Sequence, residues 1–466
     1  MTAAIGRIGF WVGILLGLTI WLLPPFGGLS GPAQATLALA AVMVLWWMTE
    51  SVPISATALL PLVLIPVLEI GTISQASSPY GNPVIFLFLG GFLLATALER
   101  CGLHKRIAYS IVSMIGMSPN RLILGFLIAS ALLSMWISNT ATALMMLPIA
   151  LSVGSIGSQY GSTDKSIAAL LLAVAFGSNL GGVGTLIGTP PNAIMVGYLD
   201  QNHGIQVGFG EWMMIGVPIV FILLPIVYFV LKRNMGYAPA VDEQAIAREV
   251  RAQRSHLGRW SAAELRVTIL FAFAASCWIF QPYLAKVIPG ISDAGVSIFA
   301  GLLLFIVPDG KDGKLLDWPD AERIPWGVLV LFGGGLSLAD AIQRTELAVW
   351  LGDSMSGLAV LPLPLIILTV SLMIIFFSEV TSNSATAAAV LPVMGALAVS
   401  LGYDPTVLVI PATLAATTAF MLPVGTPPNA IVFSSGKIRQ IDMIRTGFWL
   451  NIASAIVITV VMTIMK

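Results

Sequence analysis

The sequence predicts an all-α polytopic membrane protein, with about 11 transmembrane helices and two re-entrant hairpins arranged as an inverted repeat. Three observations support this fold class: an apolar composition, many long apolar segments, and sequence motifs that occur twice. Hydrophobic residues occupy 57% of the 466 positions and charged residues only 9%, which is too little polar surface for a water-soluble globule. Segments such as 8–23, 211–231 and 443–465 are long enough to approach or exceed a hydrocarbon core of about 30 Å.

Eleven crossings can be assigned along the chain, starting from a cytoplasmic N-terminus. Because cytoplasmic loops collect Lys and Arg, the positions of the basic residues check this assignment. It places 19 of the 22 Lys and Arg residues on the cytoplasmic side, leaves only Lys286, Arg344 and Lys466 outside, and predicts an extracytoplasmic C-terminus. The predicted crossings are 8–24, 34–48, 52–68, 84–99, 166–198, 211–231, 264–285, 294–308, 326–343, 404–432 and 443–465.

Two further apolar segments, 121–153 and 363–402, are expected to enter and leave the membrane on the same side. In the first, each arm around the polar centre has roughly sixteen residues, which is short for a full crossing. A re-entrant hairpin explains both the short arms and the polar apex at depth. The polar stretch 232–263 is predicted to be a cytoplasmic linker, with an interfacial amphipathic helix as the alternative.

Cysteine and histidine usage argues against several function classes. The two cysteines, Cys101 and Cys277, are far apart in sequence, so neither a disulfide framework nor a thiolate metal site is expected. The three histidines are scattered over polar stretches and do not have the spacing of zinc ligands. No nucleophile–base pair is apparent, so we expect no enzyme activity, and we expect no nucleic-acid partner.

Three sequence blocks occur once in each half of the chain. Two of them recur 244 residues later and the third recurs without change 237 residues later. The pairs are Gly90–Gly91 with Gly334–Gly335, Ser138–Ala143 with Ser382–Ala387, and Gly188–Ile194 with Gly425–Ile431. Close helix packing alone would explain the glycine pairs, but it does not explain duplicated Asn and Pro-Pro.

The assigned topology makes the two halves antiparallel in the membrane. The segment with Ser138 begins on the cytoplasmic side, whereas the segment with Ser382 begins outside. Inverted repeats of this kind are typical of secondary transporters.

The repeated blocks combine neutral oxygen ligands with interrupted helices. Side-chain oxygens of Ser, Asn and Thr can replace water around a sodium ion, while amide and hydroxyl hydrogens can donate to a carboxylate. Two proline pairs, Pro190 with Pro191 and Pro427 with Pro428, break a helix in each half. Each pair removes backbone donors and frees nearby carbonyls, and the helix that resumes after it directs its positive end at the same gap.

The motifs themselves contain no charged residue, so a bound anion would need cations beside it. The nearest charge is Glu379, three residues before Ser382, and the first half has Met135 at the matching position. We interpret Glu379 either as a further cation ligand or as a carboxylate at the mouth or in the packing of the hairpin.

The paired Ser-Asn-Thr and Gly-Thr-Pro-Pro-Asn motifs resemble those of the divalent anion/sodium symporter family, which includes the dicarboxylate transporters called INDY. The resemblance covers essentially the whole chain. It implies a homodimer whose protomers each have a scaffold domain and a transport domain that moves as an elevator. The expected division is scaffold helices in 1–83 and 264–325, repeat cores in 84–231 and 326–466, and the linker 232–263.

The resemblance also implies roles for individual residues. The sodium ligands would be Ser134, Ser138, Asn139 and Gly188 for one ion and Ser378, Asn383 and Gly425 for the other, with Thr381 as a weaker candidate. The substrate carboxylates would contact Asn139, Thr140, Thr189, Asn383, Ser384 and Thr426. The second tip reads Ser-Asn-Ser where the family has Ser-Asn-Thr, so Ser384 keeps the hydroxyl but lacks a methyl group.

The expected function is sodium-coupled uptake of C4-dicarboxylates such as succinate, malate and fumarate across a bacterial inner membrane. Na+ is thus the expected coupling ion, a small dianion the substrate, and membrane lipid the surroundings. The alternatives are a sodium-independent dicarboxylate exchanger and a sodium-coupled sulfate or citrate transporter of the same fold.

Overall fold

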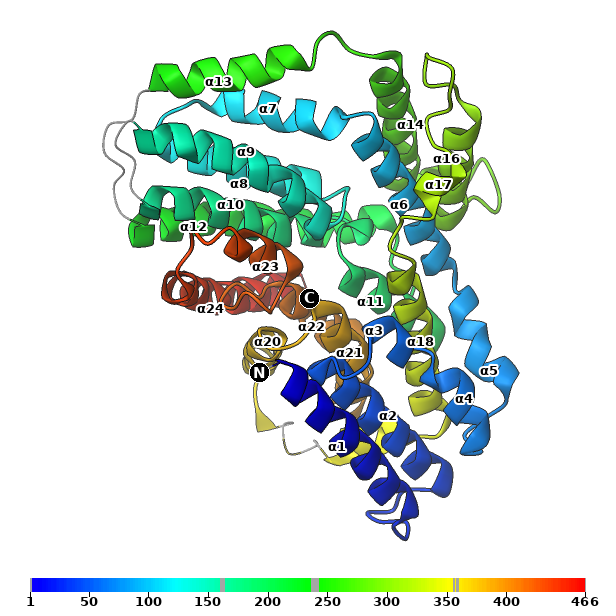
Figure 1. The fold of residues 1–466 in the computed structure, drawn as a ribbon. Coiled ribbons are helices and arrows are strands. Elements are labelled where there is room, and N and C mark those ends of the chain that lie inside the picture. The colour runs from blue at the N-terminus through cyan, green and yellow to red at the C-terminus, as the bar shows by residue number, and fades with distance from the viewer. Residues whose placement is uncertain (1, 160–163, 236–242, 355–356, 358–359, 466) are drawn as a thin grey trace.

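The computed structural model describes residues 2–159, 164–235, 243–354, 357 and 360–465, and these residues are almost entirely helical (Figure 1). Within them there is no β-strand, only an isolated antiparallel bridge between Pro308 and Lys314. The predicted all-α class is therefore confirmed for the described part of the chain.

The chain begins with two long helices and a series of short ones. Helices α1 (Thr2–Leu22) and α2 (Gly31–Thr49) pack together, and the Gln34 side chain donates to Ile20 O (2.6 Å) and Leu23 O (2.7 Å) at the end of α1. The crossing predicted at 52–68 is broken at residues 58–59. Its parts and the elements that follow are α3 (Ile54–Thr57), α4 (Leu60–Val67), α5 (Ile73–Ser77) and the 3₁₀ turn η1 (Ser78–Gly81).

The two halves then repeat the same order of elements: a long helix, a short helix, a helix–break–helix pair, an interrupted helix and a final long helix. The first half contains α6 (Pro83–Arg100), α7 (Leu103–Ile115), α8 (Pro119–Ser134), α9 (Asn139–Gln159), α10 (Asp164–Val183), η2 (Leu186–Gly188), α11 (Pro190–His203) and α12 (Phe209–Met235). The second half contains α18 (Trp326–Arg344), α19 (Leu347–Ser354), α20 (Leu363–Ser378), α21 (Asn383–Ser400), α22 (Thr406–Thr417), α23 (Pro427–Ser434) and α24 (Gln440–Ile464).

Proline marks many of these helix starts, because its fixed φ suits the first turn, where a backbone donor is not needed. Helices α6, α8, α11 and α23 all have Pro among their first residues. The breaks between Ser134 and Asn139 and between Ser378 and Asn383 fall where the duplicated Ser-Asn motifs predicted them.

The region between the halves differs from the predicted linker. Residues 243–256 of the 232–263 stretch form α13 (Glu243–His256), and residues 232–235 belong to α12, so a plain linker is wrong for these parts. Ile246 and Val250 are 1% exposed and α13 packs on α7, which agrees with the amphipathic alternative. The remaining elements are α14 (Ala262–Ile279), α15 (Gln281–Leu284), α16 (Asp293–Ile306) and α17 (Trp318–Ala321).

Two short helices, α7 and α19, were not predicted. His104 on α7 was assigned to a polar stretch, but its side chain is 6% exposed and Nδ1 lies 3.0 Å from Leu98 O. On the same helix Arg106 forms a buried ion pair with Glu264 of α14 (2.7 Å) and donates to Leu257 O and Gly258 O (3.1 Å each). The polar groups of α7 are thus used to connect the first half to α14.

Figure 1 shows α7, α8, α9, α10 and α12 as a stack of helices of similar direction, with α6, α14 and α16 running steeply beside one end of it. The two halves interlock, because α11 packs against α21 and α23 packs against α9, while α10 contacts both α22 and α23. The rings of Phe176 on α10 and Phe420 after α22 meet edge to face at 5.2 Å. The interrupted helices therefore lie at the centre of the molecule.

Eight helices among the described residues are long and apolar enough to cross a membrane, and seven more apolar helices are shorter. The outer helices expose large apolar side chains, among them Trp11, Leu15, Phe221 and Phe229, each at least 62% exposed. Such surfaces are expected of helices in contact with lipid.

Candidate functional site

The first Ser-Asn motif forms a tight break between α8 and α9. Ser138 Oγ accepts from Ala141 N (3.2 Å) and Ser138 O accepts from Thr142 N (3.0 Å), so Ser138 ends the non-helical turn and starts α9. Ser134 is fully buried, whereas Ser138, Asn139 and Thr140 are half-buried. The tip is therefore ordered by its own side chains and still partly accessible.

The Asn139 amide faces a group of oxygen atoms. One of its two terminal atoms lies 2.7 Å from Ser134 Oγ, 3.1 Å from Ser178 O and 3.2 Å from Gly188 O. These partners come from the end of α8, the C-terminal part of α10 and the last residue of η2. The structure thus brings the predicted residues Ser134, Asn139 and Gly188 together.

The second half repeats this arrangement. One terminal amide atom of Asn383 lies 2.9 Å from Ser378 Oγ, 3.1 Å from Ala416 O and 3.2 Å from Gly425 O. Ser378 also donates to Ala416 O at 2.8 Å. Ser378, Asn383 and Gly425 are therefore also brought together, at nearly the same distances as in the first half.

Each asparagine amide can turn either its nitrogen or its oxygen inward, toward the surrounding oxygen atoms. Which atom faces inward decides what each cluster can bind. If the atom is nitrogen, it donates to the surrounding oxygens and the group is satisfied without a ligand. If it is oxygen, it and two backbone carbonyls are acceptors only, and a cation would be needed to hold them together. Neutral amide, hydroxyl and carbonyl oxygens are suitable donors for Na+.

Close approach of the backbone makes both groups possible. A Cβ on Gly188 would lie 2.5 Å from Gly182 O, and one on Gly425 would lie 3.0 Å from Glu379 Oε2. A Cβ at Gly188 would overlap the backbone of α10, and a Cβ at Gly425 would crowd Glu379 at the end of α20. This is the physical reason for the glycine that opens both heptapeptides.

Glu379 is buried in the packing of the second half. Its side chain is 2% exposed, which excludes the aqueous mouth. Oε1 accepts from Phe420 N (2.7 Å), Met421 N (2.8 Å) and Asn451 Nδ2 (2.7 Å), and Oε2 accepts from Leu422 N (2.8 Å). Each carboxylate oxygen is thus already used by protein donors.

These contacts explain why the second interrupted helix ends early. In a continued helix, Phe420 N would donate to Ala416 O, but it donates to Glu379 and Asn451 instead. Helix α22 therefore ends at Thr417, and Ala416 O is left to face Ser378 and Asn383. Helix α10, whose half has Met135 at the matching position, continues to Val183.

The second Asn of each heptapeptide stabilises the helix break. Asn192 Nδ2 donates to Thr185 O (2.8 Å) and Gly182 O (3.1 Å). Asn429 Nδ2 donates to Leu422 O (3.1 Å) and Ala419 O (3.4 Å). No role was predicted for Asn192 and Asn429, although their presence in the duplicated heptapeptide was a signal.

The predicted substrate residues have different surroundings. Thr189 and Thr426 are each 2% exposed, and Thr426 Oγ1 accepts from Asn179 Nδ2 of the first half (3.0 Å). Ser384 is half-buried and lines, with Ser382, a cavity of about 480 Å³ between the second tip, α3 and α18. Among the described lining residues of this cavity, Ser384 is the only predicted substrate contact.

The comparisons with known proteins identify the family. The model of the sodium:sulfate symporter transmembrane region matches residues 8–465. This chain belongs to that family. The match confirms the resemblance that the repeated motifs predicted.

Relatives and solved structures agree with this membership. The sodium-dependent dicarboxylate transporter SdcS of Staphylococcus saprophyticus is 40% identical over 98% of this chain and 91% of its own length, and that of Staphylococcus aureus is 40% identical over 97% and 90%. The crystal structure of the Alcanivorax borkumensis YdaH transporter has a TM-score of 0.61 over 92% of this chain and 98% of that chain. At 14% identity, this last likeness shows the fold alone. The family and these relatives are transporters, so the chain is a multi-pass membrane transporter and not an enzyme.

Proposed function

We propose that this transporter couples sodium entry to uptake of C4-dicarboxylates, such as succinate, malate and fumarate, across the bacterial inner membrane. The observation that carries the proposal is the cluster of serine and backbone oxygen atoms that surrounds the Asn139 amide and recurs around the Asn383 amide. We call each cluster, together with its asparagine, an oxygen group. The 40% identity to sodium-dependent dicarboxylate transporters supports the choice of ion and substrate class.

Each oxygen group is assigned one sodium ion. The first ion would bind Ser134 Oγ, the Asn139 side-chain oxygen and the carbonyls of Ser178 and Gly188, with Ser138 beside them. The second would bind Ser378 Oγ, the Asn383 side-chain oxygen and the carbonyls of Ala416 and Gly425. The convergence of these side-chain and backbone oxygen atoms on one asparagine amide in each half supports these assignments.

The amide orientation offers a direct coupling mechanism. Without sodium, the amide nitrogen turns inward and donates to the surrounding oxygens. With sodium, the amide oxygen turns inward and the NH₂ group turns away, where it can donate to a substrate carboxylate. Sodium therefore prepares Asn139 and Asn383 for the dianion, and by linkage the dianion strengthens sodium binding.

The dianion is assigned to the hydroxyl and amide groups at the tips and helix breaks. Thr140 and Ser384 lie next to the two Asn residues, and Thr189 and Thr426 immediately precede helices α11 and α23. The N-termini of these helices and the bound cations supply positive charge that the motifs lack. If coupled sodium ions outnumber substrate charges, each net charge gains about 2.3 kcal/mol per 100 mV.

Alternating access is assigned to an elevator movement of the two helix–break–helix pairs with the interrupted helices. We assign α8–α9 and α20–α21 to re-entrant hairpins, and the protein to a homodimer whose remaining helices form the scaffold. The contacts of α11 with α21 and of α23 with α9 support this grouping, because they join the two candidate sites into one packed unit.

The function is tested with purified protein in liposomes. Labelled succinate should accumulate under an inward sodium gradient and not under potassium alone. Ser134→Ala should raise the sodium concentration for half-maximal uptake on the order of tenfold, because it removes one ligand of a charged group. Ser130→Ala is the matched control, since Ser130 lies one turn earlier on α8 and its hydroxyl has no hydrogen-bond partner among the described residues.

The same liposomes separate the alternatives. Equal succinate uptake in sodium and potassium would reject symport, and a requirement for internal succinate would indicate an exchanger. Stronger competition by unlabelled sulfate or citrate than by unlabelled succinate would assign the site to those anions.

A further inference from the structure

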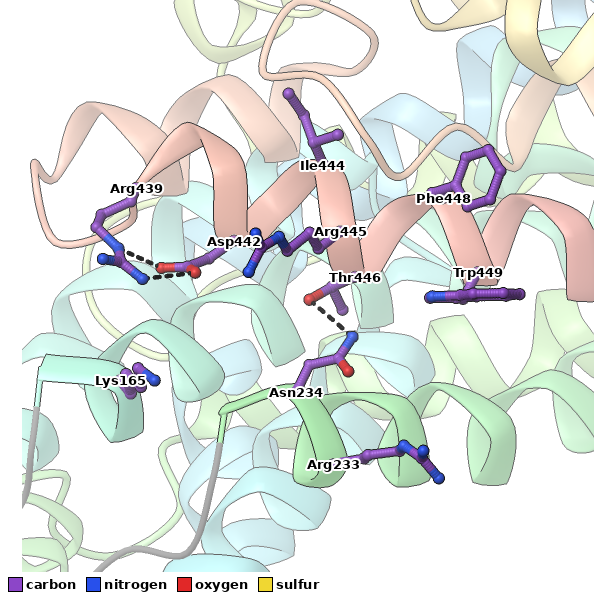
Figure 2. A pocket seen from close by; sticks show the side chains of 10 residues that line it. All are labelled: Lys165, Arg233, Asn234, Arg439, Asp442, Ile444, Arg445, Thr446, Phe448 and Trp449. Carbon is purple, nitrogen blue, oxygen red and sulfur yellow. Dashed lines mark hydrogen bonds and ion pairs between the residues drawn. The ribbon is translucent and has the colours of Figure 1, made fainter.

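A second polar cavity lies at the ends of three membrane helices, outside the duplicated motifs. It has a volume of about 500 Å³ and is formed by the start of α10, the end of α12 and the start of α24 (Figure 2). We call it the basic pocket. Its lining residues are Lys165, Arg233, Asn234, Arg439, Asp442, Ile444, Arg445, Thr446, Phe448 and Trp449.

The basic pocket carries more positive charge than its own carboxylate can neutralise. Arg439 forms a bidentate salt bridge with Asp442: Nε donates to Oδ2 (2.6 Å) and Nη2 donates to Oδ1 (2.8 Å). Among the described residues, Lys165, Arg233 and Arg445 have no ion-pair partner. Lys165 and Arg445 act on Asp442 only at longer range, so four cationic side chains from three helices share one carboxylate.

The pocket lies where candidate membrane spans end. The apolar spans Lys165–Val183, Phe209–Asn234 and Gln440–Ile464 each have a terminus in its lining or next to it. A cavity at this level opens where the hydrocarbon core meets the lipid headgroups.

Aromatic residues continue the pocket toward the expected hydrocarbon region. Trp449 and Phe448 follow Arg445 by about one turn of α24 and are 60% and 38% exposed. Their rings contact each other edge to face at 5.6 Å. Exposed Trp beside basic side chains is the combination typical of the membrane–water boundary.

We propose that the basic pocket binds the phosphate group of an anionic phospholipid, of the phosphatidylglycerol or cardiolipin class. Arg and Lys from α10, α12 and α24 would surround the phosphate oxygens, as basic pockets between membrane helices do for such headgroups. The glycerol and upper acyl chains would lie along Phe448 and Trp449. A free inorganic phosphate offers the same oxygens but no apolar part for these two rings.

Binding at this position would connect the two halves of the protein. Helices α10 and α12 belong to the first half and α24 to the second, and at this end a hydrogen bond from Asn234 Nδ2 to Thr446 Oγ1 (3.4 Å) joins α12 to α24. A lipid phosphate would add charge-assisted contacts across the same junction. We therefore expect the lipid to raise the thermal stability of the folded protein.

The test compares melting temperatures of the purified full-length protein in detergent with added lipid. Phosphatidylglycerol should raise the wild-type melting temperature by about 3 °C or more relative to phosphatidylcholine. Millimolar inorganic phosphate or succinate should give no comparable shift. The R233Q/R445Q variant should lose the phosphatidylglycerol shift, whereas R251Q/R259Q, which removes two exposed basic residues elsewhere, should keep it.

The outcomes separate the possibilities. An equal phosphatidylglycerol shift in R233Q/R445Q and wild type would overturn the proposal, and so would an equal shift with inorganic phosphate alone. If the double variant does not elute as a single species, K165Q replaces it and should show a reduced shift. The readout does not depend on transport, so it is independent of the proposed sodium coupling.

Discussion

At the scale of single residues, Glu379 marks the difference between two otherwise similar halves. Its carboxylate holds the backbone donors of Phe420, Met421 and Leu422, and this leaves Ala416 O available to the second oxygen group. The residue therefore positions Ala416 O, a proposed cation ligand, without needing to contact the proposed cation itself. We expect the second cation group to depend on a buried charge that the first group lacks.

Glu379→Gln tests this positioning role. The neutral amide keeps one acceptor oxygen but introduces an NH₂ group among backbone donors, so the unwound segment after α22 should loosen. We expect the half-saturating sodium concentration for transport to rise on the order of tenfold, with a smaller effect on the succinate KM at saturating sodium. Sodium-dependent uptake measured at several succinate concentrations gives both values.

The matched control is Glu322→Gln, which changes the same groups at an exposed position. It should leave both constants unchanged. If Glu379→Gln raised only the succinate KM and left the sodium dependence intact, the carboxylate would act on the substrate side and the positioning role would be wrong.

At the scale of elements, the glycine pairs of α6 and α18 allow close helix contacts. A Cβ on Gly90 would overlap the Ser297 backbone of α16, and one on Gly334 would overlap the Ala58 backbone. The neighbouring glycines have more room: a Cβ on Gly91 would lie 3.2 Å from the Ile187 side chain. One glycine of each pair is thus required by a backbone contact.

Gly90→Ala should therefore destabilise the protein by about 1–3 kcal/mol, because α6 must move away from α16. Gly91→Ala, one position along, should cost less because the Ile187 side chain can adjust. Thermal unfolding of both variants in the same detergent provides the comparison. Equal melting temperatures for the two variants would contradict the contact between α6 and α16.

Helix breaks were easier to predict from sequence than helix partners. Proline pairs and Ser-Asn tips act locally, so the ends of α8 and α20 and the starts of α11 and α23 could be located from the motifs. Helix α7 was missed because buried polar residues are more typical of a loop in sequence, and Arg106 becomes compatible with burial through distant partners: Glu264, 158 residues away, and the carbonyls of Leu257 and Gly258. The carbonyls of Ser178 and Ala416 were missed for a similar reason, because a backbone oxygen leaves no signature in residue type.

At the scale of the whole molecule, the inverted repeat depends on how many helices cross the membrane. Helix α16 is decisive, because it is one of the shorter apolar helices and separates two loops that were assigned to opposite sides. Its 14 residues span about 21 Å, less than the usual hydrocarbon thickness. Apolar residues on both flanks, Ile291 and Val307, extend the stretch, so we expect α16 to cross.

Single cysteines on either side of α16 test the crossing and the orientation together. Lys286→Cys and Lys314→Cys would be made in a chain whose Cys101 and Cys277 are replaced by Ser, and both positions are exposed. In intact cells, a membrane-impermeant maleimide should label the cysteine at 286, while that at 314 should react only after permeabilisation. Labelling of both in intact cells would mean that α16 does not cross. The reverse pattern would invert the whole assignment, since the crossings alternate along the chain and the same change would move the N-terminus outside.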